Sequence, residues 1–144
     1  MASEEAHAVV LMSIHPAYAA GILSGSKQVE FRRTRLCRPV SHVLIYETAP
    51  VGRLTGLFEV SGVEEGEPDA VWWRYAGVAG LDRAAYDAYF SGCQRAIAFR
   101  VENPMRLSEP LPLSALAPGV RPPQSLRYVP QEWLQRLTPA HAKE

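Results

Sequence analysis

The chain has 144 residues, of which 47% are hydrophobic and 21% are charged, and its 15 basic and 15 acidic residues give a formal net charge of zero. This balance predicts one soluble globular domain, because a chain of about 150 residues buries roughly 68–70% of its unfolded surface without disulfide or metal supports. It argues against a bulk electrostatic nucleic-acid binder, which is usually basic overall, but leaves a local basic patch open.

The amino-terminal end does not resemble a targeting signal. No apolar run approaches the roughly 20 residues that a membrane helix needs. Glu4 and Glu5 stand where a secretory signal would be basic. We therefore expect a cytoplasmic protein without a membrane partner.

The cysteines and histidines do not predict a metal site. Cys37 and Cys93 are far apart, and the four histidines lack the short spacing of zinc ligands. We therefore expect reduced thiols, no metal and no other cofactor.

Charge is unevenly distributed along the chain. Between Ser26 and Arg38 there are five basic residues and one acidic residue, Glu30, so this segment attracts anions. The segment from Glu59 to Asp69 carries five carboxylates and no basic residue. We interpret the acidic segment as a solvated surface, and its role as a gate stays open.

The first predicted elements are a strand and a short helix. Residues 8–14 are mostly apolar and predict a strand. Pro16 suits the first position of a helix, where its missing N–H costs nothing, and Gly25 suits the position just after the helix. These two residues frame a helix over 17–24.

Residues 27–33 alternate between two faces, which is the period of a strand. If Val29 and Phe31 face the core, then Glu30 and Arg32 share the opposite face. Two side chains placed in this way are close enough to contact one ligand.

The middle of the chain predicts two paired strands followed by helices. Strands at 43–47 and 54–63 flank a turn with proline and glycine, which indicates an antiparallel pair. From 68 to 90 the apolar residues take three-and-four spacing on both sides of a break at 77–80, and this pattern predicts two helices.

The carboxyl-terminal part predicts one more strand and a helix. Residues 95–101 alternate and indicate a central strand that ends at Asn103-Pro104. Eight of the twelve prolines lie from Pro104 to Pro139, so we expect no regular sheet there beyond a short edge. A terminal helix fits 131–137.

These elements predict an α+β fold in one domain over 1–144, with a core at about 9–137 and short flexible ends. Short strands in mixed order, without βαβ regularity, favour a small closed or nearly closed barrel with helices at its flanks.

One motif makes the chain resemble a known family. Directly after the predicted helix, the pattern Gly-x-Lys-x-x-Glu-x-Arg is met by Gly25, Lys27, Glu30 and Arg32. With this motif the chain resembles the ASCH domain, a branch of the PUA-like superfamily. Further agreement comes from four segments, at 11–18, 57–60, 81–92 and 123–128. The resemblance implies a PUA-like β-barrel of five or six mostly antiparallel strands with flanking short helices, and a cleft in which the polar side chains of the motif converge.

The resemblance also implies a function. Members of the family are similar to RNA-binding folds, so we expect an RNA- or nucleotide-binding domain. In such a cleft a carboxylate accepts from the amino group of a base, and a cation donates to a carbonyl or phosphate oxygen. Arginine in an exposed loop suits phosphate, and aromatic side chains suit stacking. The candidate ligand-binding residues are Lys27, Glu30, Arg32, Arg33, Arg35, Tyr46, Thr48, Trp72 and Arg127, with Arg38 as a further phosphate contact.

Three alternatives stay open. Some bacterial relatives resemble an acetylcytidine amidohydrolase or are described as ribonucleases, and in such an enzyme Lys27 and Glu30 would be the catalytic residues. The amidohydrolase branch has a threonine in place of Glu30 and a carboxylate before the second helix, whereas residues 75–80 contain none. A hydrolase would be favoured by Glu59 or Thr48 within reach of Lys27.

The other two alternatives are not enzymatic. A protein-interaction module would be favoured if Trp72 filled the cleft. The charged residues of the motif could also form surface ion pairs, worth about 0–1 kcal/mol. Base preference and oligomeric state are not predicted by the sequence.

Overall fold

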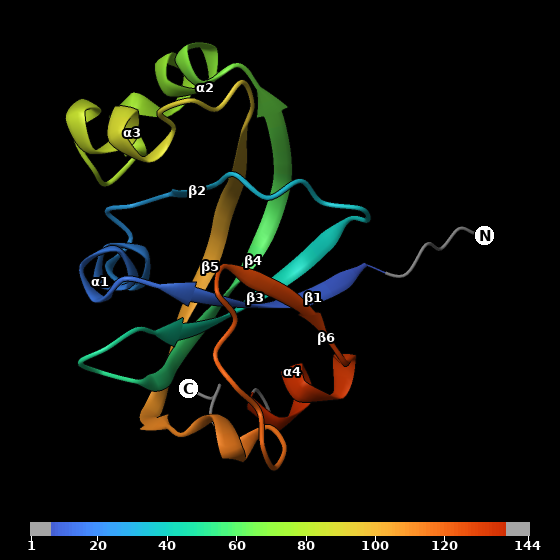
Figure 1. Ribbon diagram of the computed structural model, residues 1–144. Helices are drawn as coiled ribbons and strands as arrows, with labels where there is room; N and C mark the ends of the chain where they lie inside the picture. Colours follow the sequence, from blue (N-terminus) through green and yellow to red (C-terminus); the bar gives the residue numbers. More distant parts are fainter. Residues whose placement is uncertain (1–6, 138–144) are drawn as a thin grey trace.

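The computed structural model describes residues 7–137 and is built on one six-stranded sheet. The strands are β1 (Ala8–Ile14), β2 (Val29–Arg32), β3 (Val40–Glu47), β4 (Arg53–Gly66), β5 (Ala96–Leu111) and β6 (Leu126–Val129). Their order in the sheet is β2-β5-β4-β3-β1-β6. Only the β1–β3 pair is parallel among these neighbours. The sheet curls into a half-barrel (Figure 1), so the predicted α+β barrel-like fold is confirmed, with β2 and β6 as the edges of the sheet.

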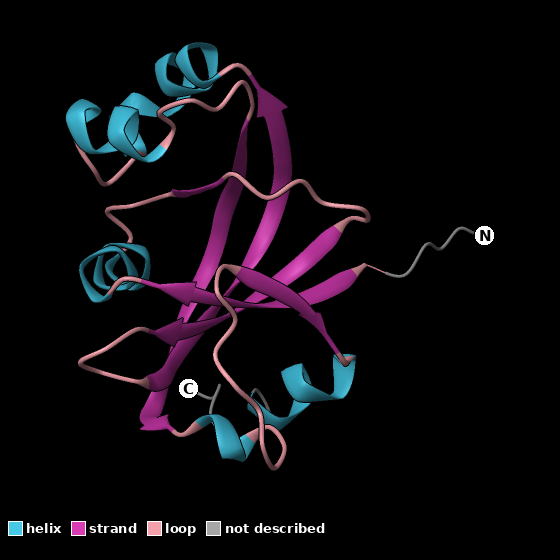
Figure 2. Cartoon of the chain, viewed as in Figure 1, coloured by secondary structure: helices cyan, strands magenta, loops and turns pink. Residues whose placement is uncertain are grey.

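Short helices flank the sheet (Figure 2). They are α1 (Pro16–Ser24), α2 (Pro68–Tyr75), α3 (Arg83–Tyr89) and α4 (Gln131–Leu137), with 3-10 turns η1 (Ala76–Val78) and η2 (Leu113–Ala115). The predicted helices are confirmed, and Gly25 ends α1 in the left-handed conformation at φ 94°. Helices α2 and α3 lie together at one end of the sheet and α4 lies at the other. Within residues 7–137, no helix has the length and apolar character needed to cross a bilayer.

Strand β5 is longer than predicted, because it continues through Asn103-Pro104 to Leu111. Asn103 takes a positive φ of 49°, and the β4–β5 register shifts at this point. Because Asn103 and Pro104 lie in a β-bulge, no sheet hydrogen bond requires a backbone N–H at Pro104. The amide of Asn103 also donates to the Glu59 carboxylate at 3.0 Å. The prediction that the prolines end this strand is therefore wrong, whereas the short edge strand β6 and the helix α4 form as predicted.

Three apolar clusters hold the fold together. Alternation along β1 directs Val9 and Leu11 to the cluster beside α4, and Val10 and Met12 to the cluster beside α1. The third cluster lies between β2 and the helices α2 and α3. The ends predicted to be flexible fall mainly on residues 1–6 and 138–144, which lie outside the described residues.

Strand β2 is covered on both faces. Val29 and Phe31 belong to the third cluster, as the alternation predicts. Glu30 and Arg32 are buried as well, at 4% and 8% exposure. An ionised pair in the interior must find partners for its charges, because burial removes the stabilising water. The polar face of β2 therefore carries the candidate functional site.

Candidate ligand-binding site

Lys27 lies between α1 and β2, and its side chain is almost completely buried, at 2% exposure. Two glycines leave room for its stem. A Cβ at Gly21 would lie 3.1 Å from the Lys27 Cβ, and a Cβ at Gly80 would lie only 2.5 Å from the Lys27 Cβ and Cγ. Gly80 also has a φ of 71°, which disfavours any other residue. The Lys27 ammonium can therefore reach inward, and it donates to the Ala79 carbonyl at 2.6 Å.

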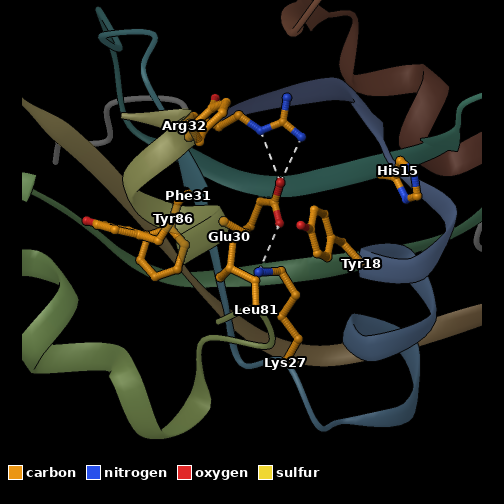
Figure 3. Close-up of a pocket in the computed structure, with 10 residues that line it drawn as sticks. His15, Tyr18, Lys27, Glu30, Phe31, Arg32, Leu81 and Tyr86 are labelled. Atoms are coloured by element: carbon orange, nitrogen blue, oxygen red, sulfur yellow. Dashed lines mark hydrogen bonds and ion pairs between the residues drawn. The ribbon is translucent and has the colours of Figure 1, made fainter. Parts of the chain in front are cut away.

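Glu30 connects Lys27 and Arg32 (Figure 3). Its Oε1 lies 3.7 Å from the Lys27 Nζ, and its Oε2 accepts from the Arg32 Nε at 3.1 Å and Nη2 at 2.7 Å. Burial lowers the pKa of Lys27 below its ordinary value, and the Glu30 carboxylate opposes this shift. The alternative of exposed surface ion pairs does not describe this buried group.

The N–H groups of Arg32 all donate hydrogen bonds to other groups of the protein. Its Nη2 also donates to the Ser13 carbonyl at 2.8 Å, and its Nη1 donates to the Ser125 Oγ at 3.2 Å and carbonyl at 3.4 Å. A guanidinium has five N–H groups, and all five have acceptors here. Ser13 belongs to β1 and Ser125 precedes β6, so Arg32 bridges the open side of the half-barrel. These contacts hold the Arg32 guanidinium in place beside the Glu30 carboxylate, at the wall of a pocket.

The three charged residues line a pocket of about 220 Å³ with mostly aromatic walls. Its lining residues are His15, Tyr18, Lys27, Glu30, Phe31, Arg32, Leu81, Ala85, Tyr86 and Tyr89. The Lys27 Nζ lies 5.1 Å from the centroid of the Tyr18 ring and 5.3 Å from that of Phe31. Apolar walls with a few convergent polar groups are typical of a ligand site. The volume lies below the roughly 300–1,000 Å³ of drug-sized pockets, so it suits a group such as one nucleobase.

Arg33 and Arg35 lie on the exposed loop that follows β2. The guanidinium of Arg33 stacks 4.5 Å from the centroid of Tyr89, a pocket residue. Arg35 pairs with Glu65 at 3.1 Å, and the same carboxylate holds Arg95 at 3.3 Å. The candidate phosphate contact Arg33 is therefore next to a residue of the pocket lining, and Arg35 is held by Glu65.

The other candidates lie apart from the pocket lining. Tyr46 packs against the cluster beside α4, and Arg127 stacks on Trp133 at 5.5 Å. Thr48 is half-buried after β3. Trp72 is buried in the third cluster, with its ring centroid 4.9 Å from that of Tyr86, and so supports a wall of the pocket from behind.

The protein-interaction and hydrolase alternatives depended on where Trp72, Glu59 and Thr48 lie. Trp72 does not fill the pocket, so the feature that would favour a protein-interaction module is not observed. Among the described residues the polar contacts of Lys27 are Ala79 and Glu30, and neither Glu59 nor Thr48 is one of them. Within residues 7–137, therefore, no second carboxylate and no hydroxyl forms a hydrogen bond with the Lys27 ammonium. Within residues 7–137, no three His, Cys, Asp or Glu side chains gather in the manner of a metal site.

Seven of the ten lining residues were missed as site residues, and four of them, His15, Tyr18, Tyr86 and Tyr89, carry a polar ring. The tyrosines lie in the two helical segments, where aromatic residues at this spacing are equally typical of core packing. A possible signal was His15, a polar ring placed directly before a helix-starting proline and next to the motif helix.

Comparison with known proteins identifies the family, because the ASCH domain model matches residues 12–105, including the whole Lys27–Arg32 motif. The chain belongs to the ASCH domain family. The resemblance inferred from Gly25, Lys27, Glu30 and Arg32 is thereby confirmed.

The chain is similar to known proteins in sequence and in fold. An ASCH domain-containing ribonuclease of Zymomonas mobilis is 34% identical over 131 residues, which cover 88% of each chain. The crystal structure of ASCH from Zymomonas mobilis has a TM-score of 0.82 and 32% identity, covering 90% of this chain and 92% of that one. The large ribosomal subunit protein uL22 of Ureaplasma parvum is 30% identical over 113 residues, which are 74% of this chain and 36% of that protein.

Proposed function

We propose that this ASCH domain binds single-stranded RNA and holds one unpaired base in the pocket against Lys27 and Glu30. The observation that carries the proposal is a buried ammonium and a buried carboxylate side by side in an aromatic-walled pocket. Base edges present donors next to acceptors, which these two groups complement. Stacking on aromatic rings adds about 1–3 kcal/mol per base.

Both groups keep hydrogen-bonding capacity for a ligand. Lys27 uses one strong N–H bond on Ala79, and its 3.7 Å separation from Glu30 is longer than a hydrogen bond. The Oε1 of Glu30 accepts no hydrogen bond from residues 7–137, while its Oε2 is held by Arg32. The carboxylate is thus fixed by one oxygen and available through the other.

The exposed arginines extend the proposal to the RNA backbone. Arg33 stacks on the pocket residue Tyr89, and we infer that its guanidinium contacts the phosphate of the nucleotide next to the bound base. Arg35 follows on the same loop. Arginine forks match phosphate oxygens, and each such contact makes binding more sensitive to salt. An RNA-related role is further supported by the relative in Zymomonas mobilis that is named a ribonuclease.

That relative favours RNA cleavage as a second candidate, because the match covers 88% of both chains. In a cofactor-independent cleavage, the 2′-oxygen would attack the adjacent phosphorus while the bond to the 5′-oxygen breaks. A base takes the 2′-hydroxyl proton and an acid returns one to the 5′-oxygen. Lys27 and Glu30 are the candidates for these proton transfers.

The test uses a fluorescein-labelled, mixed-sequence RNA of ten nucleotides. Its binding is followed by fluorescence anisotropy with the wild-type chain, Glu30→Gln and Lys27→Met, and the recovered RNA is sized on a gel. Arg106→Ala, an exposed position on β5, is the matched control.

We expect both pocket variants to bind at least about tenfold more weakly, which corresponds to about 1.4 kcal/mol, and the control to bind as the wild type does. Recovery of intact RNA supports binding alone. Shortened RNA that disappears with Lys27→Met supports the ribonuclease. Unchanged binding and unchanged RNA in both folded pocket variants would refute both candidates.

A further inference from the structure

His15 has two ring nitrogens in different surroundings. It is the residue before α1, and its Nδ1 accepts the backbone N–H of Ala17 at 3.2 Å. Its ring also lines the pocket, 5.6 Å from the ring of Tyr18. A ring nitrogen that accepts a hydrogen bond carries no proton, so the neutral ring holds its proton on Nε2. Within residues 7–137 the Nε2 has no hydrogen-bond partner, and the one hydrogen bond of the ring is that of Nδ1.

We propose that the Nε2–H of His15 donates to a backbone oxygen of the nucleotide whose base occupies the pocket. This inference rests on the proposed RNA-binding function. The oxygen belongs to a phosphate or to the 2′-hydroxyl, and both accept the same hydrogen bond. His15 is a binding residue in this account, separate from the Lys27–Glu30 pair that contacts the base.

The position of His15 relative to the buried charges supports this assignment. Lys27 and Glu30 are 2% and 4% exposed, whereas His15 is exposed. A pocket of about 220 Å³ that takes in a base leaves the attached sugar and phosphate outside. Of the ten lining residues His15 is the one that is exposed, and it lies beside Tyr18 (Figure 3), so its ring is available to those groups.

The hydrogen bond to Ala17 makes the second nitrogen a prepared donor. It fixes the ring, and it selects the tautomer that offers Nε2–H. A donor that is oriented before binding loses less rotamer freedom when the ligand arrives. The helix cap therefore depends on Nδ1, and the proposed contact depends on Nε2 of the same ring.

Two substitutions separate the two nitrogens. Asparagine is a preferred residue before a helix, so His15→Asn retains the cap, but its short side chain does not replace Nε2. In His15→Gln the amide nitrogen stands about where Nε2 stood, and the longer side chain is a poorer cap. The first variant keeps the helix start without the donor, and the second keeps the donor without the cap.

The experiment measures both properties for both variants. Binding is followed by anisotropy with fluorescein-labelled ten-nucleotide RNA and with DNA of the same sequence, and stability is followed by urea unfolding. We expect His15→Asn to unfold at the wild-type urea concentration and to bind RNA about 5–20-fold more weakly, as for one lost bond to a polar or charged oxygen. We expect His15→Gln to unfold at lower urea and to bind RNA within about twofold of the wild type.

The DNA arm identifies the oxygen. Weaker binding of His15→Asn to both oligomers assigns the contact to a phosphate, and weaker binding to RNA alone assigns it to the 2′-hydroxyl. Wild-type RNA binding by His15→Asn would overturn the proposal, as would equal weakening by the two variants, because stacking of the whole ring would then be responsible. Lys27→Met, the pocket variant expected to keep most of its stability, is the reference: if it loses binding while His15→Asn does not, only the His15 inference fails, and if it also binds normally, the proposed function fails.

Discussion

Glu30→Gln removes the negative charge from a buried group of three ionised side chains. Lys27 and Arg32 would then stay in the interior at 2% and 8% exposure with no carboxylate between them. Breaking a buried ion pair by removing one partner costs about 3–5 kcal/mol. At about 4 °C per kcal/mol for a domain of this size, the Tm should fall by roughly 12–20 °C.

Lys27→Met should be much milder. Glu30 keeps both hydrogen bonds to Arg32, and the unbranched methionine fits the path of the lysine stem past Gly21 and Gly80. The Ala79 carbonyl loses its donor, which costs about 1–3 kcal/mol, but the desolvated ammonium is removed as well. We expect a net loss below about 2 kcal/mol.

The double variant shows whether charge balance is the cause. With Lys27 already replaced, Glu30→Gln leaves one uncompensated cation instead of two. The double variant should therefore be more stable than the sum of the single effects predicts, by about 1–3 kcal/mol. The assay is urea unfolding of the four proteins at neutral pH, followed by circular dichroism. A Lys27→Met loss equal to that of Glu30→Gln, together with additive effects, would refute the reasoning.

Three further predictions concern the surroundings of the site. Gly80→Ala should destabilise the fold by about 2–4 kcal/mol in urea, since its positive φ and its contact with the buried lysine both resist a Cβ, whereas Gly77→Ala, with open space, should change little. Equal effects would contradict this account. Burial lowers the pKa of His42 below 6.5 and Glu59 partly opposes the shift, so an NMR titration should give a low midpoint that Glu59→Gln lowers further. Because folded His42 resists protonation, its contribution to stability is present above about pH 6.5 and is lost as the pH falls from there through its lower folded pKa. A titration midpoint at the ordinary value would disprove this prediction. Burial raises the pKa of Tyr86 to about 12, so phenolate absorbance up to about pH 11 should be the same in the wild type and in Tyr86→Phe; a difference of one tyrosine would count against it.

Alternation along β2 explains how part of the site could be predicted. Side chains two apart on a strand share a face, so the pairing of Glu30 with Arg32 follows from their spacing. Their burial does not follow from spacing, because it depends on helices and strands distant in the chain. Arg32 reaches Ser13 and Ser125, and these acceptors, 19 and 93 residues away in the chain, could not be predicted from the spacing of the motif.

The aromatic lining of the pocket could not be predicted from the sequence for a similar reason. Tyr18 and Tyr86 belong to α1 and α3, which β2 brings to one cavity, and each is equally consistent with core packing when read alone. The prediction that a strand ends at Asn103-Pro104 was wrong for a local reason, since a β-bulge accommodates a proline that regular strand pairing excludes.

The central claim is that the pocket between α1, β2 and α3 takes an RNA base, and an NMR titration of the isotope-labelled chain with the ten-nucleotide RNA tests it most directly. We expect the largest backbone shift changes at His15, Lys27, Glu30, Leu81 and Tyr89, and their absence in Glu30→Gln. Shift changes confined to β6 and α4, with none around the pocket, would contradict the account.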